Sequence, residues 1–252
     1  RQIHSCVRVL GFNTNLSPVD SPRLRQALAM SIDQQAILNL YDSDYQPAQC
    51  LMMPGSRGAP AVNEIADMGI QYDLEAARKM LDKFYVSPAD VPEIEIVVPS
   101  TSSSKKLANE IRRMWMDNLD LQVKVSDYSS VKFSEMLGSD TPPMVWLNSF
   151  CLDYNDAGNL FYYELFRNSV RASSRGWQNM ALLSITDQIL KENEIEKRTE
   201  LYIELEENIK SENVYLVPLF WFSSTHLVQP HLVYSLPVVD GLVQFEKWYV
   251  EK

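Results

Sequence analysis

The residues best suited to chemistry lie in one short segment, Asp153-Tyr154-Asn155-Asp156, just after a predicted strand that ends near Phe150. In a water-poor cleft, a carboxylate forms charge-assisted hydrogen bonds about twice as strong as neutral ones, so it can hold a cationic group. Open α/β sheets bind ligands just past the carboxyl ends of their strands, which is the expected position of Asp153. Two interpretations stay open at this point: Asp153 contacts a ligand, or it caps a helix that begins at Asn159.

The same segment partly matches a calcium-binding loop. Asp153, Asn155, Gly158 and Glu164 fall at positions 1, 3, 6 and 12 of an EF-hand. Position 5 is Ala157, which has no side-chain oxygen, and the residues before the loop have the pattern of a strand rather than a helix. Calcium binding is therefore not expected.

Motifs of common enzyme classes are absent from the sequence, which contains no G-x-S-x-G, no G-x-x-x-x-G-K-[ST] and no H-E-x-x-H. Asp153 and Asp156 could act as paired carboxylates, but acidic residues this close in a turn usually belong to a solvated surface. We therefore expect a protein that is not an enzyme and that needs no cofactor.

The cysteines and histidines lack the spacing of metal ligands. The three cysteines are an odd number, lie far apart and include no C-x-x-C pair, so neither a disulfide framework nor a zinc site is predicted. The residues concerned are Cys6, Cys50, Cys151, His4, His226 and His231.

The charge balance limits the partners of the protein. The chain has 252 residues, of which 33 are acidic and 23 basic, giving a net charge of −10. This charge repels phosphate backbones and anionic headgroups, so nucleic acid and membrane surfaces are not expected as partners, whereas a cationic or zwitterionic ligand is compatible with it. No stretch approaches the roughly 20 apolar residues of a membrane span.

Hydrophobic periodicity predicts an α/β fold. A strand is predicted at 5–13, then one helix at 20–37 that starts at a polar cap, and then a long irregular segment at 41–72. Asp73 caps a further helix whose apolar face includes Phe84. Strands at 94–98, 121–125 and 144–147 alternate with helices at 104–119 and 131–137, which favours a parallel sheet with helices on its faces. The remaining predicted elements are helices at 184–193 and 196–211 and strand-like segments at 214–222, 225–228 and 244–250.

Four segments in order resemble extracellular solute-binding family 5, the periplasmic dipeptide, oligopeptide and nickel binders. SPRLRQALAMSID at 21–33 is similar to the family's D-x-R-V-R-Q-A-L-x-x-A-I-D helix, and YDLEAARKML at 72–81 to Y-D-P-x-K-A-x-x-L-L. DYND at 153–156 resembles the W-x-x-D-Y-x-D-P element. Arg198, Leu201-Tyr202 and VPLF at 217–220 resemble R-x-x-L-Y-x-x-A followed by I-P-L-Y. The four segments together cover nearly all of the chain.

This resemblance implies a periplasmic-binding-protein-like second lobe, an α/β unit with a mostly parallel sheet flanked by helices, plus hinge strands. Residues 1–13 would be a hinge or first-lobe strand, 14–217 the second lobe, and 218–252 a hinge strand and a return segment to the first lobe. Most of the first lobe would then lie outside this chain, which opens without Met in a strand-like segment.

The resemblance also assigns a role to Asp153, because the aspartate of this motif in the peptide binders pairs with the α-ammonium group of the ligand. Phe150 occupies the position where many members have tryptophan, so the wall of the expected ligand site stays aromatic there. Some oligopeptide binders have an arginine at the position of Leu147, so this strand lacks that contact for a ligand carboxylate. Trp221 and Phe222 either line the cleft or belong to the core. The predicted ligand-binding residues are Asp153, Phe150, Tyr154, Trp146, Asn148, Trp221 and Phe222.

We therefore expect the substrate-binding component of an ABC importer, which captures a peptide or a similar small solute between two closing lobes and presents it to a membrane permease. The protein would be a monomer, periplasmic or otherwise extracytoplasmic, and membrane-associated. The alternative is a ligand-sensing domain of a transcription regulator with the same fold. Peptides, nickel chelates and sugars all remain open as ligands.

Overall fold

The computed structural model describes residues 2–250 apart from 42, 62, 66–67, 84, 86, 162–169, 178, 226, 228 and 234–247. The described strands are β1 (Gln2–Phe12), β2 (Gln46–Pro47), β3 (Ile94–Pro99), β4 (Val123–Tyr128), β5 (Val145–Cys151), β6 (Leu216–Ser224), β7 (Leu232–Val233) and β8 (Tyr249–Val250). The described helices are α1 (Pro22–Met30), α2 (Gln34–Leu38), α3 (Leu74–Asp82), α4 (Ser102–Leu119), α5 (Ser130–Leu137), α6 (Val170–Ser174), α7 (Met180–Lys191) and α8 (Ile195–Asn208). A 3₁₀ turn (Pro88–Asp90) precedes β3, and a π turn (Ile209–Asn213) extends α8.

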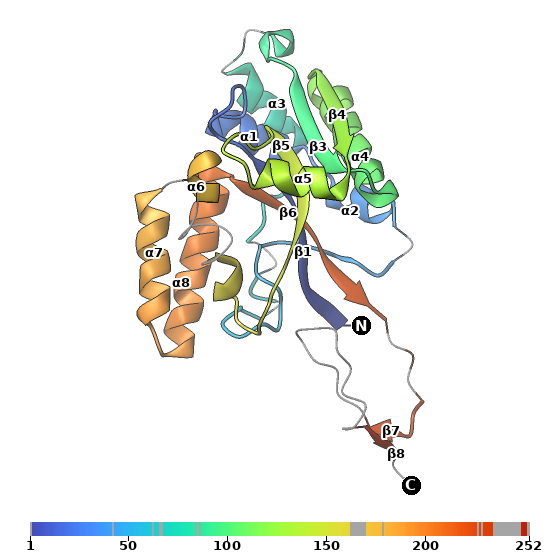
Figure 1. Ribbon diagram of the computed structural model, residues 1–252, viewed down its shortest axis with the longest axis vertical. Coiled ribbons are helices and arrows are strands. Elements are labelled where there is room, and N and C mark those ends of the chain that lie inside the picture. The colour runs from blue at the N-terminus through green and yellow to red at the C-terminus, as the bar shows by residue number, and fades with distance from the viewer. Residues whose placement is uncertain are drawn as a thin grey trace.

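Six of the strands form one twisted sheet in the order β2-β6-β1-β5-β3-β4 (Figure 1). β3 runs parallel to both β4 and β5, whereas β1 is antiparallel to β5 and β6, and β2 is antiparallel to β6. The predicted α/β class is confirmed, and the sheet is mixed rather than mostly parallel. The reason is that the strand-helix-strand pattern extends only from β3 to β5, while β1 and β6 come from distant parts of the sequence and need no crossover helix.

The sheet carries a hydrophobic core on each face. Side chains of a strand alternate between faces, so Val7 and Val9 of β1 pack into a first core with helices α7 and α8, while Leu10 and Phe12 pack into a second core with α1, α3 and α4. On β5 the same alternation places Trp146 and Phe150 in the first core and Leu147 in the second. Helices therefore cover both faces of the sheet (Figure 1).

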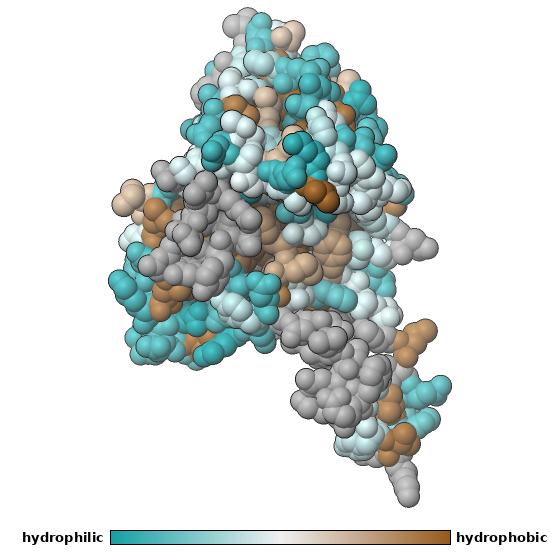
Figure 2. Space-filling model, viewed as in Figure 1, coloured by the Kyte–Doolittle hydropathy of each residue, from teal (hydrophilic) through white to brown (hydrophobic). Residues whose placement is uncertain are grey.

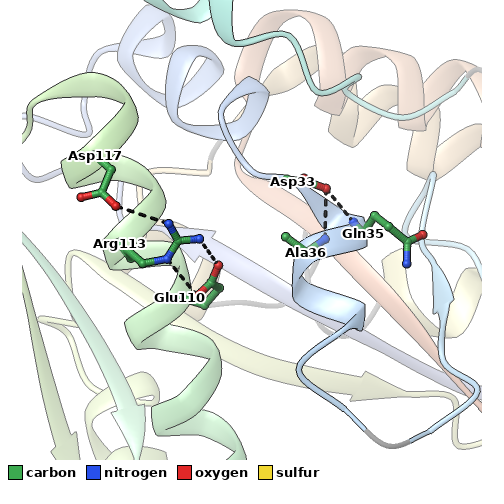
Figure 3. Close-up of polar contacts among 6 residues, drawn as sticks. All are labelled: Asp33, Gln35, Ala36, Glu110, Arg113 and Asp117. Atoms are coloured by element: carbon green, nitrogen blue, oxygen red, sulfur yellow. Dashed lines mark hydrogen bonds and ion pairs between the residues drawn. The ribbon is translucent and has the colours of Figure 1, made fainter.

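One predicted helix is two helices in the structure. α1 ends at Met30, and α2 begins at Gln34 because the carboxylate of Asp33 accepts hydrogen bonds from the backbone N–H groups of Gln35 (2.9 Å) and Ala36 (3.1 Å), as Figure 3 shows. The predicted cap of α3 is confirmed, since Asp73 accepts from the N–H of Ala76. Phe84 and residues 226, 228 and 244–247, for which we predicted structure, lie outside the described residues.

A disulfide joins Cys6 and Cys151, a pair that the spacing of the cysteines did not predict. The two residues face each other in the β1–β5 ladder although they are 145 positions apart in the sequence. Sequence spacing could not reveal the pair, because only the sheet brings the two strands together. Cys50 remains a free, buried thiol.

Position 11 must be glycine because the side chain of Trp146, its partner in the β1–β5 ladder, fills the space where a Cβ atom would lie. A Cβ atom at Gly11 would lie 2.2 Å from the indole of Trp146, which is fully buried and packs on Trp177.

We expect Gly11→Ala to lower the free energy of unfolding by about 1–3 kcal/mol, because the ring of Trp146 must move within a packed core. Urea unfolding measures this. Gly138→Ala is the matched control, since a Cβ there meets only ordinary contacts, and equal losses in the two variants would contradict the packing argument.

Candidate ligand-binding site

Asp153 lies just beyond the carboxyl end of β5, on the loop that leads to a helical turn at 158–161. Its backbone N–H donates to Oδ1 of Asn159 (2.9 Å), while its side chain is exposed and pairs with no other described residue. The expected alternative role of helix cap falls to Asp156, whose Oδ1 accepts from the N–H of Gly158 (2.8 Å). Within the described part of the chain, Asp153 is thus an unpaired carboxylate on a hydrogen-bonded loop.

Asp156 anchors this loop to α8. Its Oδ1 accepts hydrogen bonds from the hydroxyl of Tyr202 (2.9 Å) and from Nη2 of Arg198 (3.0 Å). The exposed fractions of the Asp156 and Arg198 side chains are only 14% and 17%, so solvent screens this ion pair weakly. Burial and the carboxylate of Asp156 raise the pKa of the Tyr202 phenol, which therefore stays a hydrogen-bond donor at neutral pH.

A second segment, residues 48–58, supports the loop from its other side. Asn155 accepts a hydrogen bond from the N–H of Arg57, and the N–H of Ala157 donates to the carbonyl of Arg57. This segment is itself held by Glu206 of α8, whose Oε1 accepts from the N–H of Met52 (2.8 Å). Glu206 is buried, and burial raises the pKa of its carboxyl to about 8.

One face of α8 therefore fixes both segments. Arg198, Tyr202 and Glu206 are four residues apart, a spacing that aligns side chains along a helix. The family pattern includes Arg198 and Tyr202 but assigns no role to either residue. The spacing of a cation, a phenol and a carboxylate on one helical face is the sequence signal that could have identified this support.

A cavity of about 240 Å³ lies beside the loop, between the loop and helices α7 and α8. Its walls combine aromatic and aliphatic side chains with the Asp156–Arg198 pair. Tyr154, one of the predicted residues, lines it and is 48% exposed, whereas Asp153 is not part of its wall. The lining residues are Tyr154, Asp156, Gly158, Phe161, Thr186, Ile189, Leu190, Arg198 and Tyr202.

Three of the predicted ligand contacts are core residues. Trp146, Trp221 and Phe150 are 0%, 3% and 7% exposed, so their side chains are buried in this structure and their role as ligand contacts stays a prediction. They are buried because they project from central strands under helices and the 48–53 segment. Asn148 and Phe222 are partly exposed, and Phe222 packs against Tyr45. In Figure 2, hydrophobic surface shows in the recess below α5.

No described residues form a group of ligands suited to a metal ion, and Glu164, the last position of the calcium-loop pattern, lies outside the described part of the chain. No helix in the described ranges is long and apolar enough to cross a membrane.

Comparison with known proteins identifies the family. The model for bacterial extracellular solute-binding proteins, family 5 (middle), matches residues 2–170. This chain belongs to family 5. The match includes β1, the parallel strands β3 to β5 and the loop that carries Asp153. Members of this family are extracellular solute-binding proteins, as the family description states.

The relatives and the structural neighbours agree with this assignment. The oligopeptide-binding protein OppA of Bacillus subtilis is 26% identical over 246 residues, which are 94% of this chain and 44% of OppA. An oligopeptide ABC transporter substrate-binding domain from Bacillus anthracis superposes with a TM-score of 0.79 at 20% identity, covering 100% of this chain and 50% of that one. Haemophilus influenzae OppA, solved in complex with RPPGFSPFR, gives a TM-score of 0.76 at 19% identity, covering 100% and 49%. The chain thus spans about half the length of the family 5 proteins that it matches.

We expect Asp156→Ala to lower the free energy of unfolding by about 2 kcal/mol, because Arg198 and Tyr202 lose their shared acceptor in a weakly solvated place. Asp153→Ala is the matched control and should change stability by less than about 0.5 kcal/mol, since its carboxylate is exposed and no described residue pairs with it. Urea unfolding followed by circular dichroism measures both. A larger loss for the Asp153 variant would contradict the assignment of the anchor.

We expect Glu206 to make the protein less stable as the pH rises from about 5 to 8. The pKa of the carboxyl is about 8 when folded and 4.5 unperturbed, so within this window the folded state binds a proton that the unfolded state lacks. Stability then falls with pH, by up to about 1.4 kcal/mol per unit from this group. Glu206→Gln should flatten the dependence, whereas the exposed neighbour change Glu207→Gln should not. Melting temperatures across the range test this, and identical slopes for wild type and Glu206→Gln would refute it.

Proposed function

We propose that this chain is part of the substrate-binding component of an ABC importer and that it captures peptides through Asp153. The observation that carries the proposal is the exposed Asp153 carboxylate, which pairs with none of the residues that the structure describes. Its backbone is fixed just beyond a strand that runs parallel to its neighbour β3. Such a group suits the α-ammonium group of a peptide, with which it can form a charge-assisted hydrogen bond. The name of the Bacillus subtilis relative, oligopeptide-binding protein OppA, supports a peptide as the ligand.

The path of the chain supports two lobes that close on the ligand. Gln2 at the start of β1 pairs with Ser224 at the end of β6, so the chain enters and leaves the sheet side by side at one end, as Figure 1 shows. We assign residues 1–13 and 218–252 to connections with a companion lobe, and 14–217 to the lobe that carries Asp153. Closure would bring groups of both lobes onto the ligand and select the closed state.

The same proposal places the protein outside the cytoplasm, attached to the membrane, as a monomer that delivers its ligand to the permease of the importer. The Cys6–Cys151 disulfide supports an oxidising compartment, since such bonds are rare in the cytosol. The relatives named above are transport-related binding proteins, which favours a transport receptor over a sensor domain of a transcription regulator. The names of these relatives also argue against a catalytic role.

Calorimetry on the full-length protein tests the proposal, with tetraalanine and its N-acetyl derivative as probes. Because acetylation removes the ammonium charge that Asp153 pairs with, we expect it to weaken binding about 10- to 100-fold. Asp153→Asn should weaken binding of tetraalanine similarly and remove the difference between the two probes. Asp140→Asn, an equal change of charge at another exposed aspartate, is the control.

Two results would count against the proposal. Unchanged affinity for tetraalanine in Asp153→Asn would remove Asp153 from the site. Failure of free and acetylated peptides of several lengths and compositions to bind the wild type would reject peptide capture altogether.

A further inference from the structure

The cavity between the loop after β5 and helices α7 and α8, which pack side by side (Figure 1), is left unused by the capture of an ammonium group at Asp153. Its volume is about 240 Å³, and Asp153 is not part of its wall. Tyr154 and Leu190 line it and are 48% and 43% exposed, so solvent reaches the cavity at these side chains. Phe161 and Ile189, which also line it, are buried. The cavity thus combines an exposed rim with an apolar interior.

The apolar wall is held in place before any molecule binds. The rings of Phe161 and Tyr202 stack with their centroids 5.9 Å apart. The hydroxyl of Tyr202 donates to Asp156, which fixes the ring on the loop side, and Ile189 adds an aliphatic surface from α7. A preformed concave wall that is mostly apolar and carries a few polar groups is typical of small-molecule sites.

Arg198 brings unused hydrogen-bond donors to this wall. Both hydrogen bonds that it makes to described residues, to Asp156 and Tyr202, come from Nη2. Its Nε is buried without a partner among the described residues, and none of them accepts a hydrogen bond from Nη1. Donors that are withdrawn from water and left unpaired are unfavourable. An acceptor oxygen on a bound molecule would therefore be stabilised by the guanidinium.

The charges of the wall favour a neutral molecule. Asp156 and Arg198 are the charged side chains among the described lining residues, and they form an ion pair at 3.0 Å. Oδ1 of Asp156 also accepts from Tyr202 and from the N–H of Gly158, so this carboxylate already has partners and attracts a cation only weakly. An anion at Arg198 would in turn be repelled by Asp156. A neutral acceptor avoids both costs.

We propose that this cavity is a second ligand site, separate from Asp153, for a small neutral molecule with one apolar ring and a carbonyl oxygen that accepts a hydrogen bond from Arg198. The size follows from the volume: an apolar cavity of about 150 Å³ holds benzene, so this one has room for a ring with a short polar substituent. Benzamide has this chemistry. The inference goes beyond the proposed function and does not depend on peptide binding.

Methyl NMR on the full-length protein, labelled at the Cδ1 atoms of isoleucine, tests the site with benzamide, toluene and benzoate as probes. Ile189→Val identifies the signal of Ile189, which reports on the wall. Benzamide should shift this signal and bind about tenfold or more tightly than toluene, which offers the guanidinium no acceptor. Benzoate should bind no more tightly than benzamide, because Asp156 already neutralises Arg198.

Two variants locate the bound probe. Leu190→Trp narrows the cavity and should weaken benzamide about tenfold or more, whereas Leu16→Trp, at a leucine of similar exposure outside the wall, should not. Arg198→Lys keeps a positive charge beside Asp156 without the planar fork, so it should remove the preference for benzamide over toluene. Arg113→Lys, at an exposed arginine on α4, is the control and should keep this preference.

The ratio of two probes measured on one variant separates recognition from a loss of stability, which affects both probes equally. An Ile189 signal that benzamide does not shift, equal binding of benzamide and toluene, or tighter binding of benzoate overturns the inference. Wild-type behaviour of both Leu190→Trp and Arg198→Lys also overturns it.

A titration of benzamide in saturating tetraalanine tests whether the site is separate. Both molecules should bind together, because Asp153 is not part of the cavity wall. Mutual exclusion would make the cavity part of the peptide site and overturn the separation. If tetraalanine does not bind, the proposed function is weakened, while the benzamide titration without peptide still decides the second site.

Discussion

Strand β1 is hydrogen-bonded on both sides, to β5 and to β6, and the alternation of its side chains divides the interior into two cores. Val7 and Val9 belong to one core and Leu10 and Phe12 to the other. Because this strand is central, each of its positions has a fixed environment: Gly11 lies beneath an indole, and Arg8 reaches α4. A shift of one residue in its register would exchange the two faces, so the sheet, both cores and the polar groups depend on the same pairing.

The second organising feature is the polar face of α8. Arg198 and Tyr202 hold the loop after β5 through Asp156, while Glu206 holds the segment 48–58 that contacts the same loop. Charged and polar groups are buried here, and the hydrogen bonds of Asp156 and Glu206 offset part of the cost, although Nε of Arg198 is buried without a described partner. The result is a loop whose backbone is fixed, while the side-chain carboxylate of Asp153 remains available to solvent. Rigid support of this kind reduces the entropy lost when a ligand binds.

The sequence was informative where local periodicity determines structure. The strand-helix alternation from Ile94 to Leu147 predicted three parallel strands and their helices, and the polar cap Asp73 predicted the start of α3. It failed where contacts are distant: no spacing indicates that Cys6 meets Cys151 or that Arg198 meets Asp156. Trp146 and Trp221 are of a residue type that often lines binding sites. Whether they are buried instead depends on which helices cover their strands, and the sequence does not show this. No local sequence pattern predicts the environment of Arg8, because its contacts come from β5, α4 and the segment after α2.

The Cys6–Cys151 bond has a mechanical consequence. It clamps β1 to β5 near the end at which the chain enters the sheet, so these strands cannot slide or splay apart between that bond and Phe12. In the two-lobe arrangement proposed above, a hinge would therefore lie outside the clamp, in the few residues before Cys6 and in the facing end of β6. The bond would then confine bending to the margin of the sheet and keep β1 and the strand that leads to Asp153 together as one body.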